Sequence, residues 1–541
     1  MPHTAHVDTF ARDNLPPGEQ WPEFLFELPY VRYPARLNCA EELLDEMVDS
    51  GHSGRPALHA RAEGGKYVCT YGELLRRANR IAHVLQRELG LVPGARVLLR
   101  GPNNPMMVAC WFAVLKAGCI VVATMPLLRA KELVQIIDKA KLSVALCDVR
   151  LDGELKTAAS QCRDLKDIVY FNDDGPDSLE HLMTLHPETF SNVDTASDDV
   201  ALIAFTSGTT GQPKATVHFH RDVLAMADCF PRTCLKPSAS DICCGTPPLA
   251  FTFGLGSLMA FPMRFGASTV LIEKPTPEAL LQSIQDFRVT TCFTAPTYYR
   301  KMAGIAHSFD LSTLTQCVSA GEALPDATRQ LFKQATGVEI VDGIGATEMT
   351  HFFISHAPER VRRGATGYPI LGYRASVLDE SGAPCPPGVV GRLAVKGPTG
   401  CRYLADPRQA SYVQGGWNIT GDAYSMDADG YFYYQARTDD MIISAGYNIA
   451  GPEVEWALLE HEAVVECGVV GVPDEERGQV VKAVVVLKAG YSAEDSMVRA
   501  LQEHVKAAIA PYKYPRRIQF VHELPRTETG KLQRFKLRQM G

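Results

Sequence analysis

The stretch TSGTTGQPK at residues 206–214 follows directly on the apolar run VALIAF at residues 200–205. Its glycines let backbone N–H groups turn inward as an anion-binding nest, and its hydroxyls and lysine add further donors. A phosphate group is therefore the expected ligand at the end of a predicted strand. The stretch is not a Walker A loop, because Pro213 stands at the position of that motif's second glycine and Ala215 at that of its Mg²⁺-binding hydroxyl. It indicates another kind of nucleotide chemistry.

The length and the composition exclude several classes of protein. At 541 residues the chain is too long for one hydrophobic core, so we expect a large domain of several subdomains and at least one smaller domain. The net charge of −8 argues against nucleic acid as the main partner. The 15 cysteines are scattered without a C-x-x-C motif, which favours reduced, buried thiols in a cytoplasmic protein over a disulfide framework or a zinc site. The polar N-terminus has neither the pattern of a signal peptide nor that of a transit peptide.

One apolar stretch, VACWFAVLKAGCIVVATMPLL at residues 108–128, has the length of a membrane span. Lys116 and Gly118 interrupt it in the middle, and Pro126 ends it. The pattern therefore predicts a helix, a glycine turn and a buried strand, and we expect no membrane partner.

Strand-like runs alternate with amphipathic helical runs along most of the chain, which predicts a layered α/β fold. The clearest predicted strands lie at residues 95–101, 142–148, 268–273, 290–296 and 315–321. After a Gly-rich and aromatic stretch, a shorter α+β pattern begins near residue 438, with strands at 463–472, 480–488 and 516–521 and a helix at about 494–509. We therefore predict a large multi-subdomain α/β domain at 1–437 and a smaller α+β domain at 438–541. The basic tail at 511–541 is of the kind that usually forms a solvated face.

Five motifs together resemble a known superfamily. TSGTTGQPK, GIGATEM (343–349), TGD (420–422), RTDDMIISAGYNI (437–449) and PRTETGK (525–531) occur in the order and spacing of the acyl-adenylate-forming, or AMP-binding, enzymes. FTFGLG (251–256) and DGIGATEMTHFF (342–353) resemble the benzoate-CoA ligase branch, and AHVDTFARDNLPP (5–17) resembles 2-aminobenzoate-CoA ligases.

The resemblance implies a reaction that begins with ATP. A carboxylate attacks the α-phosphate to give an acyl-AMP and pyrophosphate, and the thiol of coenzyme A then displaces AMP. Bringing two anions together requires that their charge be neutralised in place. The resemblance assigns the β- and γ-phosphates to Thr206, Ser207, Gly208, Thr209, Thr210, Gly211 and Lys214.

Other nucleotide contacts follow from the same resemblance. Glu348 is the expected Mg²⁺ carboxylate, with Thr347 donating to the α-phosphate, because hard oxygen ligands suit Mg²⁺ near phosphates. Asp422 would accept from the ribose hydroxyls, and Arg437 would contact ribose and phosphate. The adenine site would comprise Ala320, Gly321, Glu322, Asp342, Gly343 and Ile344. Ile344 stands where the family usually has an aromatic residue, which implies an apolar contact in place of an aromatic stack.

The smaller domain is expected to move between the two half-reactions. Lys531 resembles the lysine that bridges the incoming carboxylate and the α-phosphate during adenylation. Rotation about a hinge at Asp439 would then replace Lys531 by the loop that contains Ser444, Gly446 and Tyr447, along which the pantetheine arm would run.

The remaining motif residues describe a short pocket for the acid. Thr252 and Phe253 would form one wall, Ala320 and Gly321 a second, and Gly343, Ile344 and Gly345 a flat floor, with Met349 and His351 completing the slot. The slot has no charged partner for an ammonium group, so benzoate-type acids are expected, 2-aminobenzoate above all. Neutral His351 or Thr252 would accept from an ortho-amino group.

Two classes of function compete for this sequence. A non-catalytic binding module would be expected to lose Lys531, Glu348 or Asp439, and all three are present. The preferred hypothesis is therefore an acid-thiol ligase that uses ATP, Mg²⁺ and coenzyme A. The alternatives are a stand-alone adenylating enzyme that loads the phosphopantetheine of a carrier protein, and a ligase for a different small acid.

Overall fold

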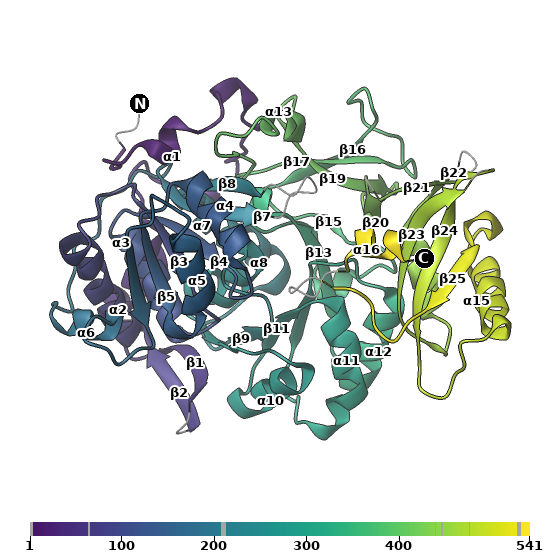
Figure 1. The fold of residues 1–541 in the computed structure, drawn as a ribbon, viewed down its shortest axis with the longest axis horizontal. Helices are drawn as coiled ribbons and strands as arrows, with labels where there is room; N and C mark the ends of the chain where they lie inside the picture. Colours follow the sequence, from purple (N-terminus) through teal and green to yellow (C-terminus); the bar gives the residue numbers. More distant parts are fainter. Residues whose placement is uncertain are drawn as a thin grey trace.

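The computed structural model describes residues 4–62, 65–206, 213–438, 440–444, 447–474, 476–526 and 532–540. These residues form a large N-terminal α/β part and a smaller α+β part at the C-terminal end (Figure 1), as predicted. Several predicted site residues lie outside the described residues, namely Ser207, Gly208, Thr209, Thr210, Gly211, Asp439, Gly446 and Lys531.

The first sheet carries the phosphate-loop motif at one end. Its six strands follow the order β6-β5-β3-β4-β7-β8, parallel except for the β7–β8 pair. The predicted strands at 95–101 and 142–148 are β3 and β5, and helices α3 and α4 connect β3 to β4 and β4 to β5. The bounds are β3 (Arg96–Arg100), β4 (Ile120–Thr124), β5 (Val144–Asp148), β6 (Asp167–Phe171), β7 (Val200–Thr206), β8 (Lys214–Phe219), α3 (Pro105–Lys116) and α4 (Ala130–Ala140).

The apolar stretch at 108–128 folds as predicted into a helix, a turn and a strand. Helix α3 ends at Lys116, Gly118 turns the chain with a φ of 69°, and β4 begins at Ile120. A positive φ costs glycine no steric strain, which explains the residue at this turn. Across the described ranges, no helix has the length and apolar character needed to cross a membrane.

The second sheet has nine strands in the order β15-β14-β13-β12-β11-β9-β10-β1-β2. Strands β10, β9, β11, β12 and β13 run parallel, whereas β14 returns antiparallel beside β13. The bounds are β1 (Pro56–Ala62), β2 (Gly65–Thr70), β9 (Ile242–Gly245), β10 (Ser268–Val270), β11 (Thr291–Thr294), β12 (Gln316–Ser319), β13 (Ile340–Gly345), β14 (Phe352–Ser355) and β15 (Tyr368–Pro369). Helices α10 (Pro277–Phe287), α11 (Pro296–Ile305) and α12 (Asp326–Thr336) accompany it.

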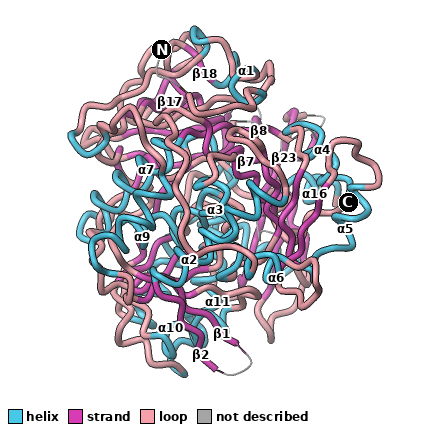
Figure 2. The backbone as a smooth tube through the Cα atoms, turned by 90° about the vertical axis from the view of Figure 1, so that its left-hand side faces the viewer, coloured by secondary structure: helices cyan, strands magenta, loops and turns pink. Residues whose placement is uncertain are grey.

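One apolar core joins these two sheets. It includes Leu99 of β3 and Val341 of β13, together with side chains of α2 (Tyr71–His83), α3 and α7 (His220–Phe230). Figure 2 shows α2 and α3 side by side at this end of the molecule. All cysteines except Cys385 and Cys467 are buried, in agreement with their apolar sequence contexts.

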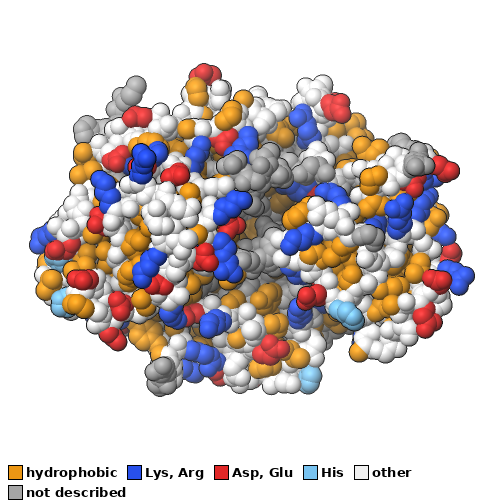
Figure 3. All heavy atoms as spheres, viewed as in Figure 1, with side chains coloured by type: hydrophobic (Ala, Val, Ile, Leu, Met, Phe, Trp, Pro, Cys, Tyr) orange, Lys and Arg blue, Asp and Glu red, His pale blue; other side chains and the backbone are white. Residues whose placement is uncertain are grey.

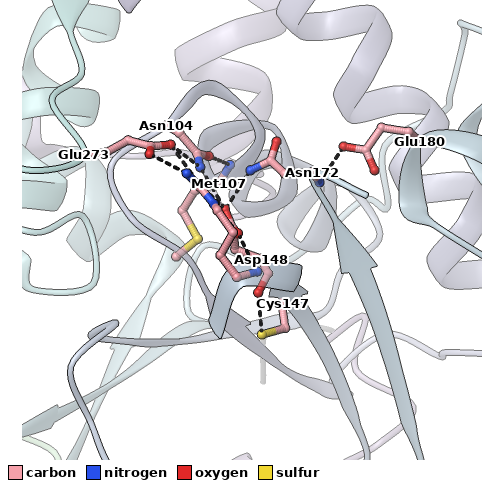
Figure 4. Close-up of polar contacts among 8 residues, drawn as sticks. Asn104, Met107, Cys147, Asp148, Asn172, Glu180 and Glu273 are labelled. Atoms are coloured by element: carbon pink, nitrogen blue, oxygen red, sulfur yellow. Dashed lines mark hydrogen bonds and ion pairs between the residues drawn. The ribbon is translucent and has the colours of Figure 1, made fainter. Parts of the chain in front are cut away.

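A polar network also ties the two sheets together (Figure 4). The Asp148 carboxylate at the end of β5 accepts from Asn172 Nδ2 at 2.6 Å and from Arg150 Nη2 at 2.7 Å. Arg150 and Asn104 both donate to Glu273, which follows β10 in the nine-stranded sheet. Burying Asp148 fully is tolerable because its oxygens are paired with donors and a guanidinium. The network therefore joins the carboxyl end of β5 in the first sheet to the segment after β10 in the second.

A third, antiparallel sheet follows before the chain enters the C-terminal part. It contains β16 (Arg374–Leu378), β17 (Gly391–Lys396), β18 (Val413–Gln414), β19 (Trp417–Met426) and β20 (Phe432–Arg437). Strand β20 ends at Arg437, and the next sheet begins with β21.

The C-terminal part has its own apolar core, formed by residues from Ile442 onward. The strands predicted at 463–472, 480–488 and 516–521 and the helix predicted at about 494–509 are β23, β24, β25 and α15. The bounds are β21 (Ile442–Ser444), β22 (Tyr447–Ile449), α14 (Gly451–Leu459), β23 (Val464–Asp474), β24 (Gly478–Leu487), α15 (Asp495–Ala508), β25 (Arg517–Phe520) and α16 (Arg534–Gln539).

The basic tail is not a plain solvated face. Lys513 pairs with Glu453 at 2.6 Å, Arg534 pairs with Glu455 through two hydrogen bonds, and Arg538 pairs with Asp440. Arg534 also donates to the carbonyl oxygen of Val469 on β23 at 2.8 Å. The tail's positive charges are therefore used to fasten it to α14 and β23.

The two parts of the molecule contact each other through charged side chains. Arg300 of α11 donates to the carbonyl oxygens of Val465 and Val464 on β23, at 3.0 and 3.3 Å. Arg526 donates to Glu322 in the N-terminal part and to Glu466 in the C-terminal part, both at 3.1 Å. Figure 3 shows a hollow between the two parts, with Lys and Arg side chains along its rim.

Candidate active site

Among the described residues, most of those predicted to bind the nucleotide lie at or just after the ends of strands β7, β12 and β13, at the start of β8, or on β19 and β20 of the third sheet. Thr206 is the last residue of β7 and is paired in register with Lys214, the first residue of β8. The described ends of the phosphate-loop motif therefore stand side by side. In open α/β sheets, the carboxyl ends of parallel strands are the usual location of a ligand.

Lys214 and Glu348 are joined by a side chain that the motif analysis missed. Lys214 Nζ lies 3.1 Å from the hydroxyl oxygen of Tyr403, and that hydroxyl donates to Glu348 Oε1 at 2.5 Å. Tyr403 is fully buried and Glu348 is 9% exposed. Burial and the neighbouring Glu348 carboxylate raise the pKa of Tyr403, so its hydroxyl keeps its proton.

Backbone pairing places Tyr403 at the site. Leu404 N donates to the carbonyl oxygen of Ala215 at 2.9 Å, so residues 402–404 run antiparallel along β8. Tyr403 N donates to Gln409 Oε1 at 2.9 Å. The only signal in the sequence was an aromatic residue in CRYLADP, 189 positions from Lys214, and neither spacing nor periodicity connects the two.

Both sides of the Glu348 turn are fixed by hydrogen bonds. Strand β13 ends at Gly345, and a short 3₁₀ turn, η10 (Thr347–Met349), carries the glutamate. His218 Nε2 lies 2.8 Å from the carbonyl oxygen of Thr347, and Thr399 Oγ1 donates to the carbonyl oxygen of Met349 at 2.7 Å. Neither His218 nor Thr399 was predicted as part of the site. They position Glu348 through its neighbours' backbone.

The predicted ribose residues face each other across two strands. Asp422 of β19 is in register with Arg437 of β20, and Arg437 Nη1 donates to Asp422 Oδ1 at 3.0 Å. Burial raises the pKa of Asp422, while the Arg437 guanidinium opposes that shift. Gly421 has a φ of 77°, and a Cβ there would lie 2.9 Å from Arg437 Nη2. The glycine of TGD therefore lets Arg437 approach Asp422.

The predicted adenine residues come from two neighbouring strands. Ala320, Gly321 and Glu322 follow β12, whose last residue, Ser319, is in register with Asp342 of β13. Burial raises the pKa of Asp342 well above its usual range. A small cavity of about 20 Å³ adjoins Asp342 and is lined in addition by Leu324, Asp326, Arg329, His356, Val361, Arg362, Gly364 and Ala365.

His351 lies in an aromatic enclosure beside the predicted acid-binding residues. Thr252 and Phe253 begin α8 (Thr252–Leu255), and the His351 ring is 4% exposed among the rings of Phe230, Phe253, Phe261 and Phe352. Burial lowers the pKa of His351 to about 3, so the ring is neutral at pH 7. A Cβ at Gly256 would lie 2.4 Å from His351 Cδ2, so only glycine lets the histidine approach this closely.

One ring nitrogen of His351 is already engaged and the other is not. Nε2 lies 3.3 Å from the carbonyl oxygen of Phe253, which can only accept, so Nε2 carries the proton. Nδ1 is then an acceptor, and it is buried without a hydrogen-bond partner among the described residues.

The two glycines expected to form the pocket floor have a further reason to be glycine. A Cβ at Gly343 would lie 2.7 Å from the Phe352 ring, and one at Gly345 would lie 2.6 Å from the carbonyl oxygen of His351. Both contacts are with β14 or the residue before it, so these glycines are required by the β13–β14 packing itself. Met349 is fully buried and Ile344 is half-buried.

The loop expected to receive the pantetheine arm lies on a β-hairpin. Ser444 and Tyr447 are paired across β21 and β22. Ser444 is 1% exposed, whereas Tyr447 is 53% exposed and its ring stacks on that of Tyr512 at 4.6 Å. Arg526 and Leu532, on either side of the Lys531 segment, form an antiparallel bridge.

The site fits a magnesium ion that arrives with ATP. Within the described ranges, no three His, Cys, Asp or Glu side chains gather in a way that could hold a metal by themselves. Glu348 supplies one carboxylate beside Lys214, and Mg²⁺ at phosphates is usually bound by one or two carboxylates, water and the phosphates themselves.

Comparison with known proteins identifies the family. The chain matches the AMP-binding enzyme family over residues 46–403 and its C-terminal domain family over residues 453–531. It is 36% identical over 517 residues to the benzoate–CoA ligase of Thauera aromatica, which covers 94% of this chain and 97% of that protein.

Solved structures are similar over nearly the whole chain, and two of them are CoA ligases for aromatic acids. The anthranilate CoA ligase AuaEII in complex with anthranoyl-AMP has a TM-score of 0.88 at 32% identity, covering 95% of this chain and 98% of that one. A benzoate CoA ligase from Burkholderia xenovorans LB400 has a TM-score of 0.84 at 32% identity, covering 93% and 100%. The protein described here therefore belongs to the AMP-binding enzymes and is an acyl-CoA ligase of that family.

Proposed function

We propose that this ligase joins a small aromatic carboxylic acid, 2-aminobenzoate or benzoate in type, to coenzyme A through an acyl-AMP. The observation that carries the proposal is the position of His351, a neutral ring in an aromatic enclosure, three residues after Glu348. The same substrate class occurs in the names of the similar benzoate and anthranilate CoA ligases.

The first half-reaction forms the acyl-AMP. An oxygen of the acid's carboxylate attacks the α-phosphorus of ATP, and the bond to the β-phosphate breaks to release pyrophosphate. We assign neutralisation of the β- and γ-phosphates to Lys214, and neutralisation of the carboxylate and the α-phosphate to Lys531. Glu348 would hold Mg²⁺, which supplies further charge neutralisation at the phosphates when bound. The Asp422 carboxylate would accept from the ribose hydroxyls.

The second half-reaction forms the thioester. The thiol sulfur of coenzyme A attacks the acyl carbon, and the bond to the AMP oxygen breaks. We infer that the C-terminal domain, residues 438–541, rotates at Asp439 between these steps and brings Ser444, Gly446 and Tyr447 to the pantetheine arm. The hairpin pairing of Ser444 with Tyr447 and the exposure of Tyr447 support this assignment.

The orientation of His351 favours an ortho-amino group on the ring of the acid. Its Nδ1 is a buried acceptor without a partner among the described residues, and an aromatic amine is a neutral donor. An unsatisfied buried acceptor is costly, so an acid that supplies the missing hydrogen bond gains affinity over one that does not. Phe253 and the other phenylalanine rings around His351 suit a flat, apolar substrate.

A pyrophosphate-release screen tests the proposal. The full chain is incubated with ATP, Mg²⁺ and coenzyme A and with a panel of aryl, arylalkyl and straight-chain acids. Release with benzoate and 2-aminobenzoate is expected, together with the corresponding aryl-CoA. Replacing coenzyme A by a phosphopantetheinyl carrier protein tests the alternative, in which the acyl group is passed to a carrier.

A further inference from the structure

We propose that Tyr403 positions the ATP-binding side chains, with its hydroxyl holding Lys214 and Glu348 apart and aimed at the triphosphate. The inference rests on the proposed function only in that Lys214 contacts phosphate and Glu348 binds the metal. It assigns a role in ATP binding to a residue outside every motif on which the family resemblance rests.

The direction of each hydrogen bond follows from the chemistry of the three groups. The Lys214 ammonium can only donate, and the Glu348 carboxylate can only accept. The Tyr403 hydroxyl has one proton, so it accepts from Lys214 at 3.1 Å and donates to Glu348 at 2.5 Å. A single hydroxyl therefore forms a hydrogen bond with both charged groups at once, and no other side-chain type with a single O–H reaches this far from the backbone.

The surroundings make this arrangement strong. Tyr403 is fully buried, and hydrogen bonds to charged groups gain strength where water is excluded. Lys214 Nζ also lies 5.1 Å from the centre of the Tyr403 ring, within the range of a cation–π contact. Because burial raises the pKa of Tyr403, the hydroxyl keeps the proton that it donates to Glu348.

The backbone of Tyr403 is fixed independently of the two charged residues. Its N–H donates to Gln409 Oε1, and the flanking Leu404 is bonded to Ala215 of β8. The hydroxyl is thus presented from a rigid segment, as a residue that orients others has to be.

Removal of the hydroxyl has a defined consequence. Lys214 and Glu348 carry opposite charges on either side of one oxygen atom, in a site of low exposure. Without the hydroxyl they attract each other directly, and ATP with its metal must then break that ion pair before it binds. The Tyr403→Phe variant should therefore bind ATP more weakly, although its ring still packs.

Tyr412 provides a matched control. Its ring packs against that of Tyr403 with 5.7 Å between centroids. Its hydroxyl is buried but makes no hydrogen bond to any described residue. Tyr412→Phe therefore removes the same atom from the same aromatic cluster without removing a bond to Lys214 or Glu348.

The experiment uses the full chain and measures KM for ATP during turnover and the affinity for an ATP analogue in the absence of turnover. We expect Tyr403→Phe to raise KM for ATP by about tenfold or more, as for a lost hydrogen bond to a charged group, and to leave KM for the acid unchanged. Calorimetry with a non-hydrolysable ATP analogue and Mg²⁺ should show the same loss of affinity. Tyr412→Phe should behave as wild type in both measurements.

A double-mutant cycle tests whether Tyr403 acts through Glu348. If it does, the effects of Tyr403→Phe and Glu348→Gln on the affinity for the ATP analogue are not additive. Wild-type affinity of Tyr403→Phe, an equal loss in Tyr412→Phe, or full additivity with Glu348→Gln would each overturn the proposal. These calorimetric results require no acid substrate, so they stand even if no aryl acid is turned over and the proposed function fails.

Discussion

Arg526 of the C-terminal part donates to Glu322 of the N-terminal part at 3.1 Å, and its other terminal nitrogen donates to Glu466 at the same distance. Glu322 closes the AGE segment after β12, and its other oxygen accepts from Thr297 at 3.0 Å. Lys531 follows Arg526 by five residues in the sequence. This contact therefore joins the segment that precedes Lys531 in the sequence to one of the predicted adenine residues.

Replacing Lys531 should separate the two half-reactions. Loss of a positioned charge in a water-poor site should lower the rate of acyl-AMP formation in Lys531→Ala by several powers of ten. Thioester formation from a supplied acyl-AMP should be retained, because the expected role of the lysine ends with adenylation. Pyrophosphate exchange and thioester formation are measured separately, and equal loss in both would contradict the assignment.

The hinge is tested by fixing one backbone angle. Asp439→Pro locks φ and should hold the C-terminal domain in one orientation. We expect adenylation to continue and transfer to coenzyme A to collapse, whereas Asp439→Ala, which keeps φ free, should retain both steps. A proline variant with near wild-type rates for both steps would exclude Asp439 as the pivot.

Asp342 gives a prediction for the pH dependence of stability. Its pKa is raised in the folded protein by burial, so its contribution to the free energy of unfolding is fully present below the unfolded pKa of about 3.9 and is lost as pH rises through the folded value. Asp342→Asn cannot ionise and should raise Tm at neutral pH, while raising KM for ATP if Asp342 contacts adenine.

A surface aspartate supplies the control for this measurement. The pKa of Asp379 is lowered by hydrogen bonds from the Ser381 hydroxyl and neighbouring backbone amides, so its contribution is present above the unfolded pKa and lost as pH falls. Asp379→Asn should therefore lower Tm at neutral pH. Thermal unfolding measured from acid to neutral pH gives the direction of the Tm change in both variants. A lower Tm of Asp342→Asn than of the wild type at neutral pH would contradict the raised pKa of Asp342.

His351→Ala tests the origin of acid selectivity. If Nδ1 accepts from an ortho-amino group, its loss should reduce the preference for 2-aminobenzoate over benzoate by about 1–3 kcal/mol in kcat/KM. Ser257→Ala is a suitable control, because Ser257 Oγ lies 3.4 Å from Nε2, on the other side of the ring from Nδ1. An unchanged ratio in His351→Ala would remove the role given to the histidine without affecting the preference for aryl acids.

The parts of the fold that were predictable are those in which local pattern and tertiary packing agree. The apolar run that forms α3 and β4 carries its own turn signal at Gly118, and strands β23 and β24 of the C-terminal part are long and rich in valine. The order of five motifs predicts the phosphate-loop, ribose and adenine residues, and these assignments stay predictions.

The contacts that were missed join segments far apart in the chain. Tyr403 lies 55 positions from Glu348, to which it is hydrogen-bonded, and His218 lies 129 positions from Thr347. Neither Tyr403 nor His218 belongs to a motif that the sequence analysis identified. The contacts of Gly343 with Phe352 and of Gly345 with His351 are closer in sequence, but they depend on the β13–β14 register, which no motif indicates; the role of these glycines as a surface for the acid stays a prediction. The ion pairs of the basic tail at 511–541 could not be predicted either, because the number of charges does not indicate which residue each charge pairs with.

The central claim, ATP-dependent formation of an aryl-CoA, is tested most directly by kcat/KM for thioester formation. The measurement compares 2-aminobenzoate, benzoate, phenylacetate and octanoate with the full wild-type chain, ATP, Mg²⁺ and coenzyme A. We predict that 2-aminobenzoate and benzoate are used best, that octanoate is poor, and that each thioester formed is matched by one AMP. Faster turnover of octanoate than of every aryl acid would contradict this account.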